Sequence, residues 1–160
     1  MMSNISGKQT IDSNVIIKAF VPPLRRKEDD IYHQQMKFHT VARQIFEKII
    51  TEKIIMYIPS VVLIEVGAVV SRITNNKMDA IEIVEKVQMY ASEILYDYDI
   101  LDHAISTAID TKASGFDNII LSCAKLTETS LITDDLKLHR IAIKNGIMSY
   151  LLRELVEAQG

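Results

Sequence analysis

The feature that most constrains this chain is the alternation of short β-type runs with helical patterns along its length. The β-type runs occupy residues 10–11, 54–58, 93–97, 130–133 and 147–151. Helical periodicity or helix-capping residues lie between successive runs. Strands separated by helices form βαβ units, so the pattern predicts an α/β fold, a three-layer α/β/α sandwich with a central parallel sheet of about five strands.

The expected helices follow from apolar stripes and from residues that start or stop a helix. Residues 14–20 are expected to form a helix that Pro22 and Pro23 end. A clear apolar stripe over 38–50 predicts the next helix, while the mixed-charge segment 25–35 is expected to be a loop within a long excursion over 21–40. Further helices are expected to start at Ser60, Asp79, Leu101, Asp117 and Asp135, and a short one to follow the last strand.

Composition removes several classes of protein. Apolar residues make up 48% of the 160 and charged residues 24%, which is typical of a globular chain, and no linker or repeat divides it, so one domain over 1–160 is expected. One cysteine allows no internal disulfide and favours a reducing compartment. The longest uncharged run, 54–64, is far shorter than the roughly 20 residues of a membrane span, and no signal sequence precedes it. We therefore expect a soluble cytoplasmic protein with no membrane association.

The net charge of −3 argues against a wholly basic surface that coats nucleic acid. It does not exclude a nucleic-acid substrate, because a local patch or a bound cation reverses the sign where contact occurs. No glycine-rich loop that cradles phosphates is present, which removes P-loop and dinucleotide-binding functions.

Glu65 is the most informative single residue. It shares a helical face with Val61, Val62, Ala68 and Val69, all of which are apolar. A carboxylate in that setting is costly to desolvate without a partner charge or a metal ion. Two other interpretations stay open, in which Glu65 reaches water at the rim of the helix or pairs with a lysine or arginine from elsewhere.

Four further acids stand where strands end or helices begin. Asp12 follows the first strand, Asp134 and Asp135 follow the fourth, and Asp117 opens a helix. Each alone is explained as a turn or helix cap. Together they lie at the edge where a parallel sheet gathers ligands. Because like charges repel, such a cluster requires protons or cations, and hard oxygen ligands suit Mg²⁺ or Mn²⁺.

Four segments resemble the PIN domain family in order and spacing. The acids occur in that family's order, Asp, Glu, Asp, Asp, at spacings of 53, 52 and 18 residues. The resemblance covers nearly the whole chain. It is carried by Ile11-Asp12-Ser13-Asn14-Val15, by Pro59-Ser60 leading to Glu65, by Phe116-Asp117-Asn118-Ile119-Ile120 with Ala124, and by Leu131-Ile132-Thr133-Asp134-Asp135.

The resemblance implies a Mg²⁺- or Mn²⁺-dependent ribonuclease. It implies that one or two ions are held by the catalytic acids, that Asn14 supports the first acid by hydrogen bonds, and that Thr133 is the small polar residue two before the last acid. Many stand-alone members are VapC-type toxins held by antitoxins, and members of this size commonly form homodimers. RNA, a small antitoxin protein and a second copy are therefore the implied partners. The implied metal-binding and catalytic acids are Asp12, Glu65, Asp117 and Asp135.

The sequence departs from the family pattern in three places. Lys8, Gln9 and Thr10 replace the usual aliphatic run of the first strand, and the excursion over 21–40 is longer than in a minimal PIN domain. Asp134 adds an acid where the family often has Asn or another polar residue. Either Asp134 or its neighbour is then the inner ligand, and the Thr-x-Asp spacing favours the neighbour.

The implied chemistry is metal-assisted hydrolysis of an RNA phosphodiester by an activated water, with no side-chain nucleophile. Basic side chains are candidates for phosphate contact, Lys18 and Arg72 first among them. The other candidates are Arg25, Arg26, Lys27, Lys77, Lys137, Arg140 and Lys144.

Two other functions stay open. A receiver-like phosphoacceptor domain also uses acids at strand ends, but it fits poorly because no acidic pair accompanies Asp12. A PIN-like fold that only binds proteins, with its acids kept for structure, is the second.

Overall fold

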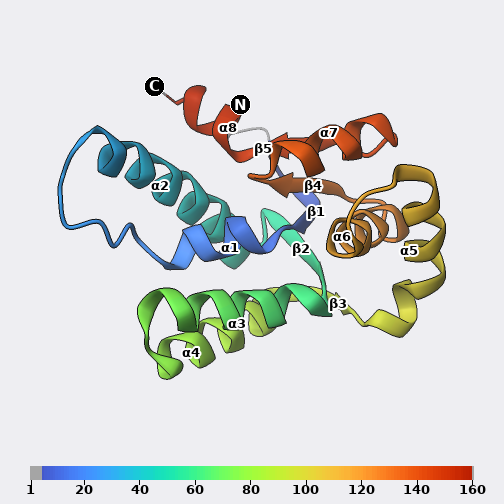
Figure 1. The fold of residues 1–160 in the computed structure, drawn as a ribbon, viewed down its shortest axis with the longest axis horizontal. Coiled ribbons are helices and arrows are strands. Elements are labelled where there is room, and N and C mark those ends of the chain that lie inside the picture. The colour runs from blue at the N-terminus through green and yellow to red at the C-terminus, as the bar shows by residue number, and fades with distance from the viewer. Residues whose placement is uncertain (1–4, 160) are drawn as a thin grey trace.

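A computed structural model of the chain describes residues 5–159 and is organised around one parallel sheet (Figure 1). Residues 1–4 and 160 of the expected 1–160 domain lie outside the described residues. The strand order is β3-β2-β1-β4-β5. The second and third strands therefore lie on one side of β1, and the fourth and fifth lie on the other side. The strands are β1 (Gly7–Ile11), β2 (Ile54–Pro59), β3 (Ala91–Leu95), β4 (Ser130–Thr133) and β5 (Ser149–Leu151).

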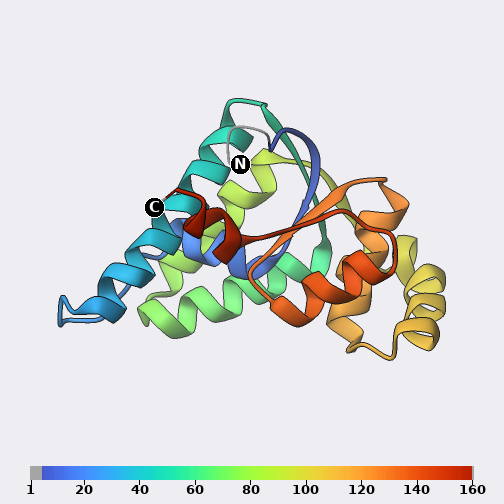
Figure 2. The ribbon, with the colours of Figure 1, turned by 90° about the horizontal axis from the view of Figure 1, so that it is seen from above.

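Two groups of helices cover the two faces of this sheet (Figure 2). The larger core joins the first four helices and the last one to β1 and β2, while two smaller cores join the remaining helices to β3 and β4. The expected three-layer α/β/α architecture with five parallel strands is confirmed. The helices are α1 (Ser13–Phe20), α2 (Asp30–Ile50), α3 (Ser60–Thr74), α4 (Lys77–Tyr90), α5 (Asp97–Thr111), α6 (Gly115–Leu126), α7 (Leu136–Lys144) and α8 (Leu152–Glu157).

The first strand is buried from Gln9 to Ile11 in spite of its polar composition. Gln9 and Thr10 are 3% and 0% exposed. The Thr10 hydroxyl lies 2.6 Å from that of Thr129, and the Gln9 side-chain amide donates to the Ser6 carbonyl at 2.9 Å. These bonds offset much of the cost of burying polar groups, which is why β1 occupies the centre of the sheet without an aliphatic run.

Of the excursion expected over 21–40, only residues 21–29 lack helical structure, and the remainder belongs to α2. The α2 helix begins at Asp30, eight residues before the apolar stripe, so the expected loop over 25–35 is wrong in its second half. Asp29 caps the helix by accepting a hydrogen bond from the Tyr32 amide at 3.1 Å, and Arg25 donates to the same carboxylate at 2.8 Å. The cap starts the helix among polar residues, where no periodicity marks it.

The α3 helix starts at Ser60 as expected, although its N-cap differs, while the expected starts of α4, α5 and α6 are displaced. Pro59, not Ser60, is the N-cap of α3, and the Ser60 hydroxyl donates instead to Asp97 at 2.9 Å. Asn76, not Asp79, caps α4 by accepting from the Met78 amide. The α5 helix begins at Asp97, four residues before the expected Leu101. The α6 helix likewise starts two residues early, at Gly115. The expected runs 93–97 and 147–151 also shift, because β3 ends at Leu95 and β5 begins at Ser149.

The α5 helix carries an apolar stripe whose large side chains face outward, while Ala104 packs against a small core. Ile100 is the only buried residue of this helix, whereas Leu101, Ile105 and Ile109 are 56%, 52% and 73% exposed. Periodicity therefore identified the apolar side of the helix without showing what covers it. Among residues 5–159, no helix is both long and apolar enough to cross a membrane.

Candidate active site

The candidate site lies where the strand order reverses, between the carboxyl ends of β1 and β4. Ile11 and Ile132 are paired in register, and the Asp12 amide donates to the Ile132 carbonyl at 3.0 Å. Asp12, directly after β1, and Thr133, the last residue of β4, therefore lie side by side. Ligands of open parallel sheets bind at such a reversal point.

Asp12 is a buried carboxylate held by three side chains. It is 4% exposed and accepts hydrogen bonds from Asn14 at 2.7 Å, Thr133 at 2.6 Å and Ser13 at 3.3 Å. Burial raises the pKa of Asp12 to about 6; the hydrogen bond from Thr133 acts against this rise, while the negative charge of Glu65 adds to it. No neighbouring cation contributes to this shift. Asp12 is thus a carboxylate that lacks a counter-charge among the described residues.

Glu65 enters the site from α3. It is half-buried, and its Oε2 accepts a hydrogen bond from the Ser13 hydroxyl at 2.7 Å. Ser13 therefore lies between the carboxylates of Asp12 and Glu65. No ion pair joins Glu65 to a lysine or arginine of residues 5–159, so the charge-paired interpretation finds no partner there.

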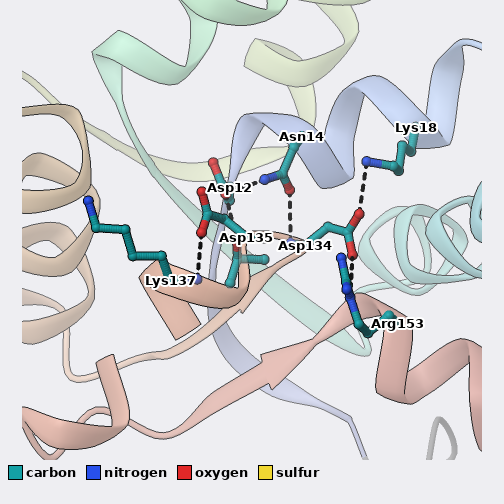
Figure 3. Close-up of polar contacts among 8 residues, drawn as sticks. Asp12, Asn14, Lys18, Asp134, Asp135, Lys137 and Arg153 are labelled. Carbon is teal, nitrogen blue, oxygen red and sulfur yellow. Dashed lines mark hydrogen bonds and ion pairs between the residues drawn. The ribbon is translucent and has the colours of Figure 1, made fainter. Parts of the chain in front are cut away.

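Of the two acids that follow β4, Asp135 is the one linked to this group (Figure 3). Its amide donates at 3.0 Å to the Thr133 hydroxyl, which in turn donates to Asp12. Asp135 Oδ1 accepts from the amides of Lys137 and Leu138 at 2.7 and 3.0 Å, so this residue caps α7 as the sequence predicts. The second carboxylate oxygen of Asp135 is not used by the cap.

Asp134 faces away from Asp12. Its amide donates to Asn14 Oδ1 at 3.0 Å, while its carboxylate lies 3.0 Å from Lys18 Nζ and 4.0 Å from Arg153 Nε (Figure 3). Asn14 therefore bonds to both the Asp12 side chain and the Asp134 backbone. Lys18, expected at the substrate, lies against Asp134.

Asp117 and Arg72 stand apart from these contacts. Asp117 is half-buried in the first turn of α6, whose cap is Ser114, and none of its described contacts reaches another acid. Arg72 is exposed in the last turn of α3. Within residues 5–159, no three Asp, Glu, His or Cys side chains are close enough together to form a ready metal-binding group. The structure thus links three of the four predicted acids through Ser13 and Thr133 and leaves Asp117 outside.

The geometry agrees with a comparison of the sequence with known families. The family model described as PIN domain matches residues 10–144, a span that holds all four acids. The chain belongs to the PIN domain family. A search of curated proteins by sequence returns no match.

Solved structures share the fold of this PIN domain at low sequence identity. VapBC2 from Rickettsia felis, bound to a DNA fragment from its promoter, is 15% identical with a TM-score of 0.59, over 90% of this chain and 98% of that one. PAE2754 from Pyrobaculum aerophilum is 14% identical with a TM-score of 0.60, over 94% and 88%. A toxin–antitoxin complex from Klebsiella pneumoniae is 19% identical with a TM-score of 0.53, over 82% and 89%.

The donor set of the PIN domain fits a hard divalent cation. Its oxygens are carboxylates, the class that Mg²⁺ and Mn²⁺ prefer. The buried carboxylate of Asp12 has no described counter-charge, and its pKa is about 6 without one. A cation beside Asp12 and Glu65 would supply the missing charge.

Two residues of the site were not singled out from the sequence. Ser13 joins two acids, and its only signal was its place between Asp12 and Asn14. Arg153 reaches Asp134 from α8, and no local pattern marked it.

Proposed function

We propose that this PIN domain is a Mg²⁺- or Mn²⁺-dependent endoribonuclease of the VapC-like kind. PIN domains are generally nucleases, and the chain belongs to that family. The observation that carries the proposal is the buried Asp12 carboxylate at the strand-order reversal, linked through Ser13 to Glu65 and through Thr133 to Asp135. A buried carboxylate without a described counter-charge is costly unless it serves to bind a cation.

In this proposal the ion is held by Asp12, Glu65, Asp117 and Asp135. When bound, it supplies Lewis acidity and lowers the pKa of a water molecule. Asn14 and Thr133 donate hydrogen bonds that hold Asp12 ionised and oriented. We assign Asp135 rather than Asp134 as the ligand, since the Asp134 carboxylate is engaged with Lys18.

The proposed partners are RNA, an antitoxin and a second copy of the chain. The structure from Klebsiella pneumoniae is a toxin–antitoxin complex of similar fold, which supports an antitoxin partner. The exposed apolar side chains of α5, Leu101, Ile105 and Ile109, support a homodimer that covers them. We place this activity in the cytoplasm, where RNA and an antitoxin are both at hand.

The test is cleavage of a broad panel of single-stranded RNAs with and without Mn²⁺. We expect Mn²⁺-dependent cleavage that Asp12→Asn and Glu65→Gln each abolish. Asp102→Asn, the same chemical change at an exposed position on α5, is the matched control and should cleave normally. A folded protein that cleaves none of the panel, and whose melting temperature does not respond to Mn²⁺, would refute the proposal.

One observation favours the non-catalytic scaffold as a second candidate. Asp117 makes no described contact with the other acids, so the four-carboxylate site is incomplete in this arrangement. If the acids serve only the fold, Asp117→Asn leaves any Mn²⁺ response unchanged. If they bind an ion, Asp117→Asn weakens that response.

A further inference from the structure

A pocket of about 660 Å³ opens beside the candidate active site, lined by residues of α1, α2 and α8. Its wall includes Lys18, Asp134 and Arg153, the charged group that leads away from Asp135 (Figure 3). The volume is that of an ordinary small-ligand pocket, which runs from roughly 300 to 1,000 Å³. Its position matters, because a ligand that enters it lies against Asp134, the sequence neighbour of Asp135.

Two of the cations that line this pocket have hydrogen-bond donors to spare. Lys18 lies 3.0 Å from Asp134, but Arg153 reaches that carboxylate only at 4.0 Å. Lys37 is exposed and makes no hydrogen bond or ion pair with residues 5–159. Against three cations the lining has two acids, Asp134 and Glu157, so positive charge is in excess. The free donors suit an anion.

The pocket also has an apolar wall. Phe38 and Ile31 line it from α2, and Phe38 packs against the buried core, which fixes the position of its ring. An aromatic ring beside guanidinium and ammonium groups is the usual arrangement for a nucleotide of a single strand, with the base on the ring and phosphate on the cations.

We propose that this pocket binds a nucleotide of the RNA strand adjacent to the scissile phosphate. Arg153 and Lys37 contact backbone phosphate, and Phe38 and Ile31 receive the base. The Asp134 carboxylate lies against Lys18 and leaves Arg153 and Lys37 available for phosphate. The inference rests on the proposed function and names where its substrate binds.

The first test measures binding without cleavage. A fluorescein-labelled single-stranded RNA oligonucleotide is titrated with the full chain in EDTA at several salt concentrations. We expect Lys37→Ala and Arg153→Ala each to weaken binding about fivefold and to reduce the slope of log affinity against log salt by about 0.7, the value for one lost phosphate contact. Lys125→Ala, an exposed lysine on α6, is the matched control and should bind as the wild type does.

The second test places the strand. RNA that carries 4-thiouridine is photo-crosslinked to the metal-free protein, and the attached peptide is identified by mass spectrometry. Crosslinks to the segment 31–38 support the pocket. Crosslinks confined to elements that do not line the pocket, or pocket variants that bind RNA as the wild type does, overturn the inference. It is also overturned if these substitutions weaken only the binding of a protein partner.

Neither test depends on catalysis, so the two proposals fail separately. RNA that binds in the pocket but is never cleaved with Mn²⁺ refutes the nuclease and leaves the subsite. RNA that is cleaved with an unchanged KM in both pocket variants refutes the subsite and leaves the nuclease.

Discussion

The buried carboxylate of Asp12 opposes folding of the metal-free protein at neutral pH, and this contribution is absent near pH 4. Its folded pKa of about 6 lies above the ordinary value of 3.8, so the folded state binds this proton more tightly than the unfolded state does. Stability from this group is therefore fully present below pH 4 and is lost as the pH rises from about 4 to about 6. A difference of about 2 pKa units corresponds to about 3 kcal/mol at neutral pH.

Asp12→Asn removes that cost while it keeps the local hydrogen bonds. The asparagine carbonyl accepts from Asn14 and Thr133, as Oδ2 of the aspartate does, and its amide faces the Ser13 hydroxyl. We expect the variant to be more stable than the wild type by about 3 kcal/mol at pH 7.5 in EDTA. The advantage should vanish near pH 4, where Asp12 is protonated.

The assay is urea unfolding of both proteins in EDTA from pH 4 to pH 7.5. The exposed Asp102→Asn is the control and should differ from the wild type by less than about 0.5 kcal/mol throughout. A variant that is less stable than the wild type at pH 7.5, or a difference that is the same at both pH values, would refute the reasoning.

Three further predictions concern other contacts. Thr133→Val deletes a buried hydroxyl that donates to Asp12 and accepts from the Asp135 amide. Urea unfolding at pH 7.5 should show that the free energy of unfolding falls by about 1–3 kcal/mol, and an unchanged midpoint would contradict this role. Asp29→Ala removes the N-cap of α2 and should lower the free energy of unfolding by about 1 kcal/mol, with faster amide hydrogen exchange confined to the first turn of that helix. Exchange that is unchanged, or that rises equally along the whole helix, would contradict the role of the cap. Ile105→Asp should lower the molar mass measured by light scattering from that of a dimer to that of a monomer. A wild-type protein that is itself monomeric would refute the proposed homodimer.

The sequence predicted the sheet well, because strands and the helices between them leave local patterns. The β4 strand and the α1 helix fall where apolar runs and prolines place them, and Asp135 caps α7 as expected. The start of α2 was missed because residues 30–37 are mixed in charge and only the Asp29 cap sets it. Cap assignments failed where neighbouring residues compete, as Asn76 does with Asp79.

Other features depend on distant parts of the chain and leave no local signal. Asp134 and Asp135 are adjacent in sequence, but they face different ways because Lys18 and Arg153 attract the first and the backbone of α7 binds the second. The apolar stripe of α5 is readable from periodicity, but its exposure is decided by packing. The pocket beside the site brings together helices from both ends of the chain.

The central claim is that the acids at the reversal of strand order bind a divalent cation. The most direct test is a crystal soaked in Mn²⁺ and measured at the manganese absorption edge, where the anomalous signal locates the ion. We predict a peak in contact with the carboxylates of Asp12 and Asp135, with Asp117 turned toward it. A well-ordered crystal with no peak at these carboxylates, or with manganese bound only elsewhere, would contradict the account.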